Sequence, residues 1–142
     1  MIFKKGTPEK TIQIIDAYIR KNEEIPIIVE GSRDLDALRR IGFKGNVIVF
    51  NAGLTIVAFA DQIAKTHDRV VLLFDFDRKG TSLRKRLSSI LDPIISEVDS
   101  ALWVYIRENL PVRTVEELPS IMETVNEAIG TGVTRRRQPD RK

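Results

Sequence analysis

The sequence predicts an α/β fold in which a parallel sheet of about four strands lies between two layers of helices. Short runs of β-branched and apolar residues alternate along the chain with segments of about ten residues whose apolar positions have helical spacing. The short runs are apolar on both faces, which is typical of strands buried in a parallel sheet. Strand–helix–strand units of this length form right-handed crossovers and place helices on both faces of the sheet.

The first half of the chain predicts an opening helix and two strand–helix units. Residues 7–22 begin with a capping threonine and a proline, and their isoleucines have helical spacing, so we expect a helix there. The run IPIIVE at 25–30 predicts the first strand, and 32–42 the helix that follows it. A second strand at 46–51 and a second crossover helix at 54–66 repeat the pattern.

The second half of the chain continues the alternation. A third strand is predicted at 69–77, where apolar residues lead into two aspartates, and a helix at 81–91. Residues 94–98 predict a fourth short strand. Residues 99–109 predict a helix capped by its first residue, although a strand through ALWVYI is an alternative. A last helix is predicted at 116–129.

Length, composition and charge predict one globular domain with a basic tail. The chain has 142 residues, of which 42% are hydrophobic and 30% charged. Residues 135–142 carry five cations and one anion, or +4, so the net charge of +3 leaves about −1 on residues 1–134. We expect a domain over 1–134 and a disordered tail, which could hold phosphate backbones or serve only as a solubilising end.

Several classes of protein are excluded by what the sequence lacks. The longest apolar runs are too short to span a bilayer, and the N-terminal residues do not resemble a secretory signal. The chain has no cysteine, so a cysteine-ligated metal site is excluded. We therefore expect a cytoplasmic protein that does not act at a membrane.

Carboxylates follow two of the predicted strands. Glu30 ends the first strand with Gly31 behind it, and Asp75 and Asp77 end the third strand with Gly80 behind them. In an open parallel sheet, ligands bind beyond the carboxyl ends of the strands. If these two strands are neighbours, three carboxylates share a small volume, where their repulsion raises a pKa or requires a cation.

A divalent cation is the partner that these residue types favour. Oxygen ligands without a nearby histidine or cysteine select hard ions, and Mg²⁺ completes its coordination with water and substrate phosphates. We therefore predict a Mg²⁺ site, with Mn²⁺ as a substitute, at Glu30, Asp75 and Asp77. Each motif also has a simpler interpretation, since Asp77 could cap the next helix and Glu30 could be an ordinary strand end.

Together the two motifs resemble the Toprim domain. IIVEG at 27–31 and LLFDFDRKG at 72–80 are similar to the Glu-Gly and Asp-x-Asp-x-x-Gly motifs of this family. The family includes type IA and type II topoisomerases, bacterial-type primases, overcoming-lysogenisation-defect nucleases and the five-S ribosomal RNA maturation nuclease. The resemblance covers about 24–98, leaves 99–130 as a helical extension, and is greatest for the primase and maturation-nuclease branch and its small stand-alone proteins.

The resemblance implies a Rossmann-like Toprim fold and a role for each motif residue. Glu30 corresponds to the proposed general acid or base, and Asp75 and Asp77 correspond to Mg²⁺ ligands. Arg33 could contact a phosphate, or it could be a solvated helix residue. Asp34 could cap its helix or support the site from behind.

The function that follows is Mg²⁺-dependent processing of RNA or DNA phosphodiesters, by a nuclease rather than a primase, with a protein partner that could supply substrate recognition. Neither Tyr18 nor Tyr105 predicts a topoisomerase nucleophile, and the absence of cysteine excludes a primase zinc module.

Two alternatives remain open at the level of the sequence. The chain could be a noncatalytic Toprim module that binds nucleic acid or protein, or one subunit of a primase or nuclease complex. It could also be a haloacid-dehalogenase-like phosphatase, because FDFDRKGTSL resembles that family's loop; Asp75 would then be the nucleophile and Asp77 the acid or base.

Overall fold

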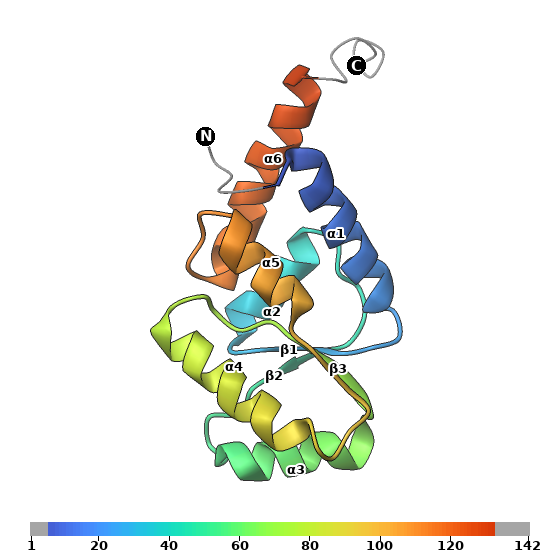
Figure 1. The fold of residues 1–142 in the computed structure, drawn as a ribbon, viewed down its shortest axis with the longest axis vertical. Helices are drawn as coiled ribbons and strands as arrows, with labels where there is room; N and C mark the ends of the chain where they lie inside the picture. Colours follow the sequence, from blue (N-terminus) through green and yellow to red (C-terminus); the bar gives the residue numbers. More distant parts are fainter. Residues whose placement is uncertain (1–5, 133–142) are drawn as a thin grey trace.

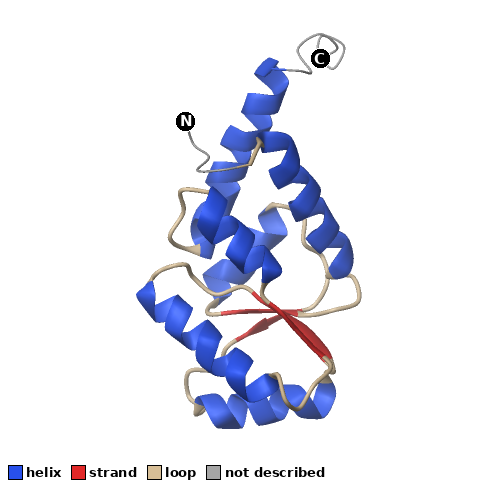
Figure 2. Ribbon diagram, in the orientation of Figure 1, coloured by secondary structure: helices blue, strands red, loops and turns tan. Residues whose placement is uncertain are grey.

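The computed structural model describes residues 6–132, with side chains to residue 130, and confirms the α/β prediction. Four parallel strands in the order β2-β1-β3-β4 form one sheet with helices on both faces (Figures 1 and 2). In chain order the elements are α1 (Pro8–Lys21), β1 (Ile27–Val29), α2 (Ser32–Arg40), β2 (Val47–Val49), α3 (Ile56–Thr66), β3 (Arg69–Leu72), α4 (Arg78–Leu91), β4 (Glu97–Asp99), α5 (Ala101–Asn109), the 3₁₀ turn η1 (Val115–Glu117) and α6 (Leu118–Gly132).

The sheet separates two apolar cores. Side chains of α3 and α4 pack on one face against Ile28 and Leu72, and those of α1, α2, α5 and α6 pack on the other against Ile27 and Val29 (Figure 1). Successive residues of β1 therefore enter opposite cores, and all three are fully buried. This two-sided burial is the reason that the strand sequences are apolar without alternation.

Two predicted boundaries were wrong around the aspartates. The strand expected at 69–77 is paired only over Arg69–Leu72, and the chain then leaves the sheet: the N–H of Phe76 donates to the carbonyl of Arg113 at 2.8 Å. The helix expected at 81–91 begins three residues earlier, at Arg78. The two aspartates therefore lie in a short loop between β3 and α4.

The segment with two interpretations is a helix. Residues of ALWVYI belong to α5, and the strand alternative is wrong. Asp99 ends β4 and accepts a hydrogen bond from the N–H of Ala101 at 2.8 Å, while Ser100 occupies the N-cap position. The last helix begins at Leu118, two residues after the predicted start. The predicted basic tail at 135–142 lies outside the described residues.

The topology places the two acidic motifs side by side. β1 and β3 are parallel neighbours with Ile28 level with Leu72, so both strands run toward the same edge of the sheet. The carboxyl ends of the two strands are therefore adjacent, which is the condition that the predicted carboxylate site requires. Between residues 6 and 132, no helix combines the length and apolarity needed to cross a membrane.

Candidate functional site

Glu30 and Asp75 meet where β1 and β3 end. The backbone N–H of Asp75 donates to Oε2 of Glu30 at 3.1 Å, although the two residues are 45 positions apart in the chain. Both side chains are half-buried. The predicted juxtaposition of the first and third strand ends is therefore present as a direct hydrogen bond.

Residues from the C-terminal part of the chain also hold Asp75 in place. Its Oδ1 accepts the N–H of Val115 at 2.9 Å, and its carbonyl oxygen accepts the indole N–H of Trp103 at 3.3 Å. Neither contact was predictable from local sequence, because the partners lie 40 and 28 residues further along the chain. These contacts leave Oδ2 of Asp75 without a hydrogen bond from the described residues.

Asp77 is the N-cap of α4. Its Oδ1 accepts the N–H of Gly80 at 2.8 Å, and its carbonyl accepts the hydroxyl of Thr81 at 2.8 Å. The simpler interpretation of Asp77 as a helix cap is therefore correct. It does not exclude ligand binding, since within residues 6–132 no group donates a hydrogen bond to Oδ2.

A fourth carboxylate lies close to these three. Asp34, in the first turn of α2, is only 5% exposed, and its Oδ2 accepts the N–H of Gly31 at 3.0 Å. Burial and the charge of Asp75 raise the pKa of Asp34 to about 6, against the hydrogen bond from Gly31. The alternative that Asp34 supports the start of its helix is therefore confirmed.

Burial and neighbouring carboxylates raise the pKa of Glu30 and of Asp75, as predicted for a shared site. Burial raises the pKa of Glu30, with smaller contributions from the charges of Asp75 and Asp77 that oppose the effect of Lys79. Burial also raises the pKa of Asp75, and the charge of Asp77 adds to it. Glu30 and Asp75 therefore favour an arrangement in which a proton or a cation reduces the negative charge.

The chemistry of this donor set fits Mg²⁺ or Mn²⁺. Three carboxylates, each with an oxygen to which the described residues donate no hydrogen bond, offer the hard ligands that these ions prefer. The side chains are not gathered for binding, however: between residues 6 and 130 no three histidine, cysteine, aspartate or glutamate side chains are placed to hold a metal ion. Coordination by all three would require their side chains to turn toward a common ion.

Basic residues surround the carboxylates on one side. Helix α4 carries five cationic residues and no acidic residue: Arg78, Lys79, Arg84, Lys85 and Arg86. Three of these, with Arg107 of α5, line an open cleft of about 590 Å³ that also contains Asp77. Arg84 lies over the ring of Trp103 at 4.2 Å, so the same tryptophan that holds Asp75 also holds a cation of α4.

Arg33 does not join the carboxylates. It is exposed in the first turn of α2 and forms no ion pair with an acidic residue of the described chain. Its predicted contact with a phosphate stays a prediction. Lys79 was not singled out from the sequence, yet it lies close enough for its charge to lower the pKa of Glu30.

Asp34→Asn is expected to stabilise the metal-free protein above about pH 6 by about 1–3 kcal/mol. The pKa of Asp34 is about 6 in the folded state against 3.8 ordinarily, so the folded state binds the proton more tightly. Wild-type stability therefore falls as the pH rises from about 4 to about 6, whereas asparagine stays neutral and can still accept the Gly31 N–H.

Urea unfolding in EDTA across this pH range measures the effect of Asp34→Asn. Asp36→Asn, an exposed position on the same helix, is the matched control and should retain the wild-type slope. An unchanged slope in Asp34→Asn would contradict a raised pKa at this position.

Comparisons with known proteins agree with the arrangement of these motifs. Residues 25–105 match the Toprim domain family model. A UPF0292 protein of Thermoplasma volcanium is 48% identical over 106 residues, covering 75% of this chain and 89% of the relative. A UPF0292 protein of Methanocaldococcus jannaschii is 33% identical over 113 residues, covering 78% of this chain and 88% of the relative.

A solved structure also resembles the fold. It is a protein from Aquifex aeolicus that superposes with a TM-score of 0.61 at 25% identity, covering 77% of this chain and 95% of that chain. The family match spans more than half of the chain and includes Glu30, Asp75 and Asp77. The chain therefore belongs to the Toprim domain family.

Proposed function

We propose that the protein is a Mg²⁺-dependent nuclease that cleaves phosphodiester bonds in RNA or DNA. Membership of the Toprim family indicates a metal-dependent role in nucleic-acid processing. The observation that carries the more specific proposal is the position of the carboxylates. Asp75 and Asp77 directly precede a helix with five cations and no acid, and Glu30 accepts a hydrogen bond from Asp75.

Asp75 and Asp77 are the proposed ligands of the metal, with Glu30 as a third. A bound Mg²⁺ would polarise the phosphate and compensate the negative charge that develops on it. Glu30 is proposed to accept a proton from the attacking water, or to return one to the leaving oxygen. Its raised pKa supports this role, because the side chain then exchanges a proton closer to neutral pH.

The cations of α4 are proposed to hold the nucleic-acid backbone. Lys85 and Arg86 lie in the open cleft beside Asp77 and have no acidic partner on their own helix. Phosphates along a strand would supply the missing negative charge. Arg33 could add a further phosphate contact from α2, and the tail at 135–142 could do so from outside the described residues.

The alternatives receive less support. Neither tyrosine is placed as a topoisomerase nucleophile, since the hydroxyl of Tyr18 donates to Asp99 and that of Tyr105 bonds to Thr11. The Toprim match favours this family over the haloacid-dehalogenase-like phosphatases. A noncatalytic module would not require Glu30 beside Asp75. Cytoplasmic location and a protein partner that recognises the substrate remain proposals.

The test is release of labelled fragments from single- and double-stranded RNA and DNA in Mg²⁺, Mn²⁺ or EDTA. Cleavage is expected in either metal and not in EDTA. Asp61→Asn removes a carboxylate outside the proposed site, because Asp61 is exposed on α3 and pairs with Lys65. This control variant is expected to cleave like the wild type. Binding of these polymers without metal-dependent cleavage would contradict the nuclease and favour a noncatalytic module.

A further inference from the structure

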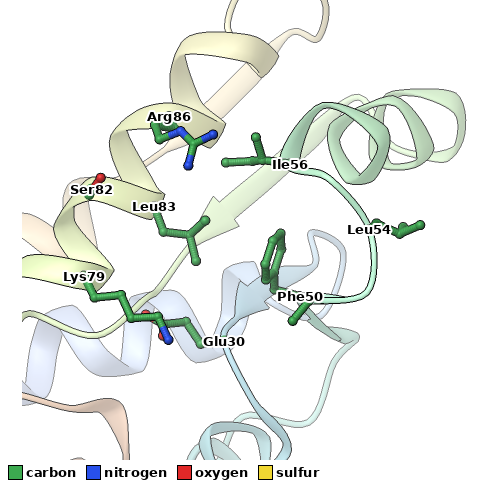
Figure 3. A pocket seen from close by; sticks show the side chains of 9 residues that line it. Glu30, Phe50, Leu54, Ile56, Lys79, Ser82, Leu83 and Arg86 are labelled. Atoms are coloured by element: carbon green, nitrogen blue, oxygen red, sulfur yellow. The ribbon is translucent and has the colours of Figure 1, made fainter.

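A second cavity lies next to the open cleft along α4 and shares Ser82 and Arg86 with it. It has a volume of about 450 Å³ and lies between the end of β2, the start of α3 and the first turns of α4 (Figure 3). Glu30 is part of its lining, so the cavity reaches one of the three carboxylates of the proposed site. A cavity of this size is within the range that accommodates small ligands or parts of larger ones.

The walls of the cavity are apolar and include one aromatic ring. Three of the wall side chains face the same space: Phe50, which directly follows β2, Ile56 of α3 and Leu83 of α4 (Figure 3). The ring of Phe50 is half-buried and makes an edge-to-face contact with Phe59, with the ring centroids 4.8 Å apart. The backbone N–H of Phe50 donates to the carbonyl of Val29 at 2.8 Å, which fixes the backbone next to Glu30.

The loop that closes this wall is ordered by its own hydrogen bonds. Oδ1 of Asn51 accepts the N–H of Gly53 at 2.9 Å, and the hydroxyl of Thr55 accepts the N–H of Ala58 at 3.0 Å as the cap of α3. Phe50 itself is held by two contacts: its backbone bonds to Val29 of β1, and its ring packs against Phe59 of α3. The ring is a preformed surface rather than a side chain that must be ordered on binding.

Cations lie at two places around the apolar walls. Figure 3 shows Lys79 beside Glu30 at one end of the cavity and Arg86 at the other. An aromatic wall with neighbouring cations suits an unpaired nucleobase with its phosphates, because every base has a flat face that stacks on an aromatic ring. A purely apolar ligand would leave the charge of Arg86 without an acidic partner at its end of the cavity, since Glu30 lies beside Lys79 at the other end.

We propose that this cavity binds one unpaired base of the strand whose phosphodiester faces Glu30, an inference that rests on the proposed nuclease function. The base lies against Phe50, and Lys79 and Arg86 contact the flanking phosphates. A base within a duplex is stacked and paired, so it reaches the cavity only if it leaves the helix. The substrate is therefore single-stranded nucleic acid, or a strand with an unpaired nucleotide at the cleavage site.

Binding is measured with labelled oligonucleotides in Ca²⁺ in place of Mg²⁺, so that cleavage does not consume them. The probes are single-stranded oligothymidine and oligouridine, a duplex of the same length, and a single strand of abasic nucleotides. The wild type is expected to bind the normal single strands about tenfold or more tightly than the duplex or the abasic strand. Phe50→Ala and Phe50→Leu are expected to lose about tenfold in affinity for the normal single strands only.

Val57→Ala is the matched control, because Val57 is 62% exposed on α3 and does not line the cavity. Phe50→Leu keeps an apolar side chain against Phe59 and so protects the fold if alanine does not. Wild-type protein supplies a measurement that needs no variant: a 2-aminopurine base in the bound single strand should lose fluorescence on stacking.

Three outcomes would overturn this inference. Equal affinity for duplex, abasic and normal strands, or Phe50 variants that bind like the wild type, would remove the base pocket while leaving metal-dependent cleavage and the nuclease proposal intact. A bound 2-aminopurine that keeps its fluorescence would do the same. Failure to bind or cleave any of these polymers would overturn the inference together with the proposed function.

Discussion

Glu30→Gln is expected to lower the rate of Mg²⁺-dependent cleavage by about 10²–10⁴-fold, the contribution typical of one general acid or base. Glutamine has the same shape, and its Oε1 can still accept the N–H of Asp75, so the ends of β1 and β3 stay together. What is lost is the ability to exchange a proton. Single-turnover cleavage over a range of pH is the measurement, and the variant should also lose the limb of the profile that reports ionisation of Glu30.

Asp77 supplies the control that separates fold from metal binding. Asparagine is as good an N-cap as aspartate, so Asp77→Asn should retain wild-type stability in EDTA, whereas Asp77→Ala should lose about 1 kcal/mol. Both should weaken the stabilisation that added Mg²⁺ gives to the wild type. Equal stabilisation of Asp77→Asn and wild type by Mg²⁺, or full activity of Glu30→Gln, would contradict the proposed roles.

The predicted fold follows from the periodicity of the apolar residues. Strands such as Ile27–Val29 are buried on both faces, so apolar and polar residues do not alternate in their sequence. In the helices between them, the apolar residues recur every three or four positions. The rule for strand ends then placed both acidic motifs at one edge of the sheet. Their adjacency depends on the strand order, which local sequence does not determine; only the pairing of β1 with β3 establishes it.

The end of β3 was misplaced for a physical reason. Phe74 is buried against α3 and α4, and Phe76 packs on the other side, where it stacks with Trp103. The side chains therefore keep the alternation of a strand after the backbone has left the sheet. Periodicity reports where side chains are buried, and it does not report where the hydrogen-bonded ladder ends.

The surroundings of Asp75 were beyond the reach of local patterns. Val115 and Trp103 reach it only because the chain returns through β4 and α5 to the same edge of the sheet. Phe50 was likewise predicted only as part of a strand, since nothing in the run 46–51 shows that one ring face borders a cavity. Such contacts depend on long-range packing, whereas the carboxylates were found because their residue types and spacing carry the chemistry.

Gly80→Ala is expected to cost about 3 kcal/mol of stability and to abolish cleavage. A Cβ at this position would lie 2.1 Å from the carbonyl oxygen of Asp75 and 2.6 Å from its carbonyl carbon. Neither atom can yield alone: the backbone of Asp75 is held by Glu30 and Trp103, and the N–H of Gly80 is held by Asp77. The better helix propensity of alanine, about 1 kcal/mol, does not compensate for such a clash.

The other motif glycine provides the matched comparison, measured by urea unfolding and cleavage rate. A Cβ on Gly31 would meet nothing closer than Oδ2 of Asp34 at 4.0 Å, and its φ of −146° is extended backbone that any residue adopts. Gly31→Ala should therefore cost less than about 1 kcal/mol, mainly through a poorer N-cap. If both variants lose stability equally, close packing of α4 on Asp75 is wrong. If only Gly80→Ala is destabilised, glycine is required at this position because α4, capped by Asp77, can approach the backbone of Asp75 only without a side chain between them.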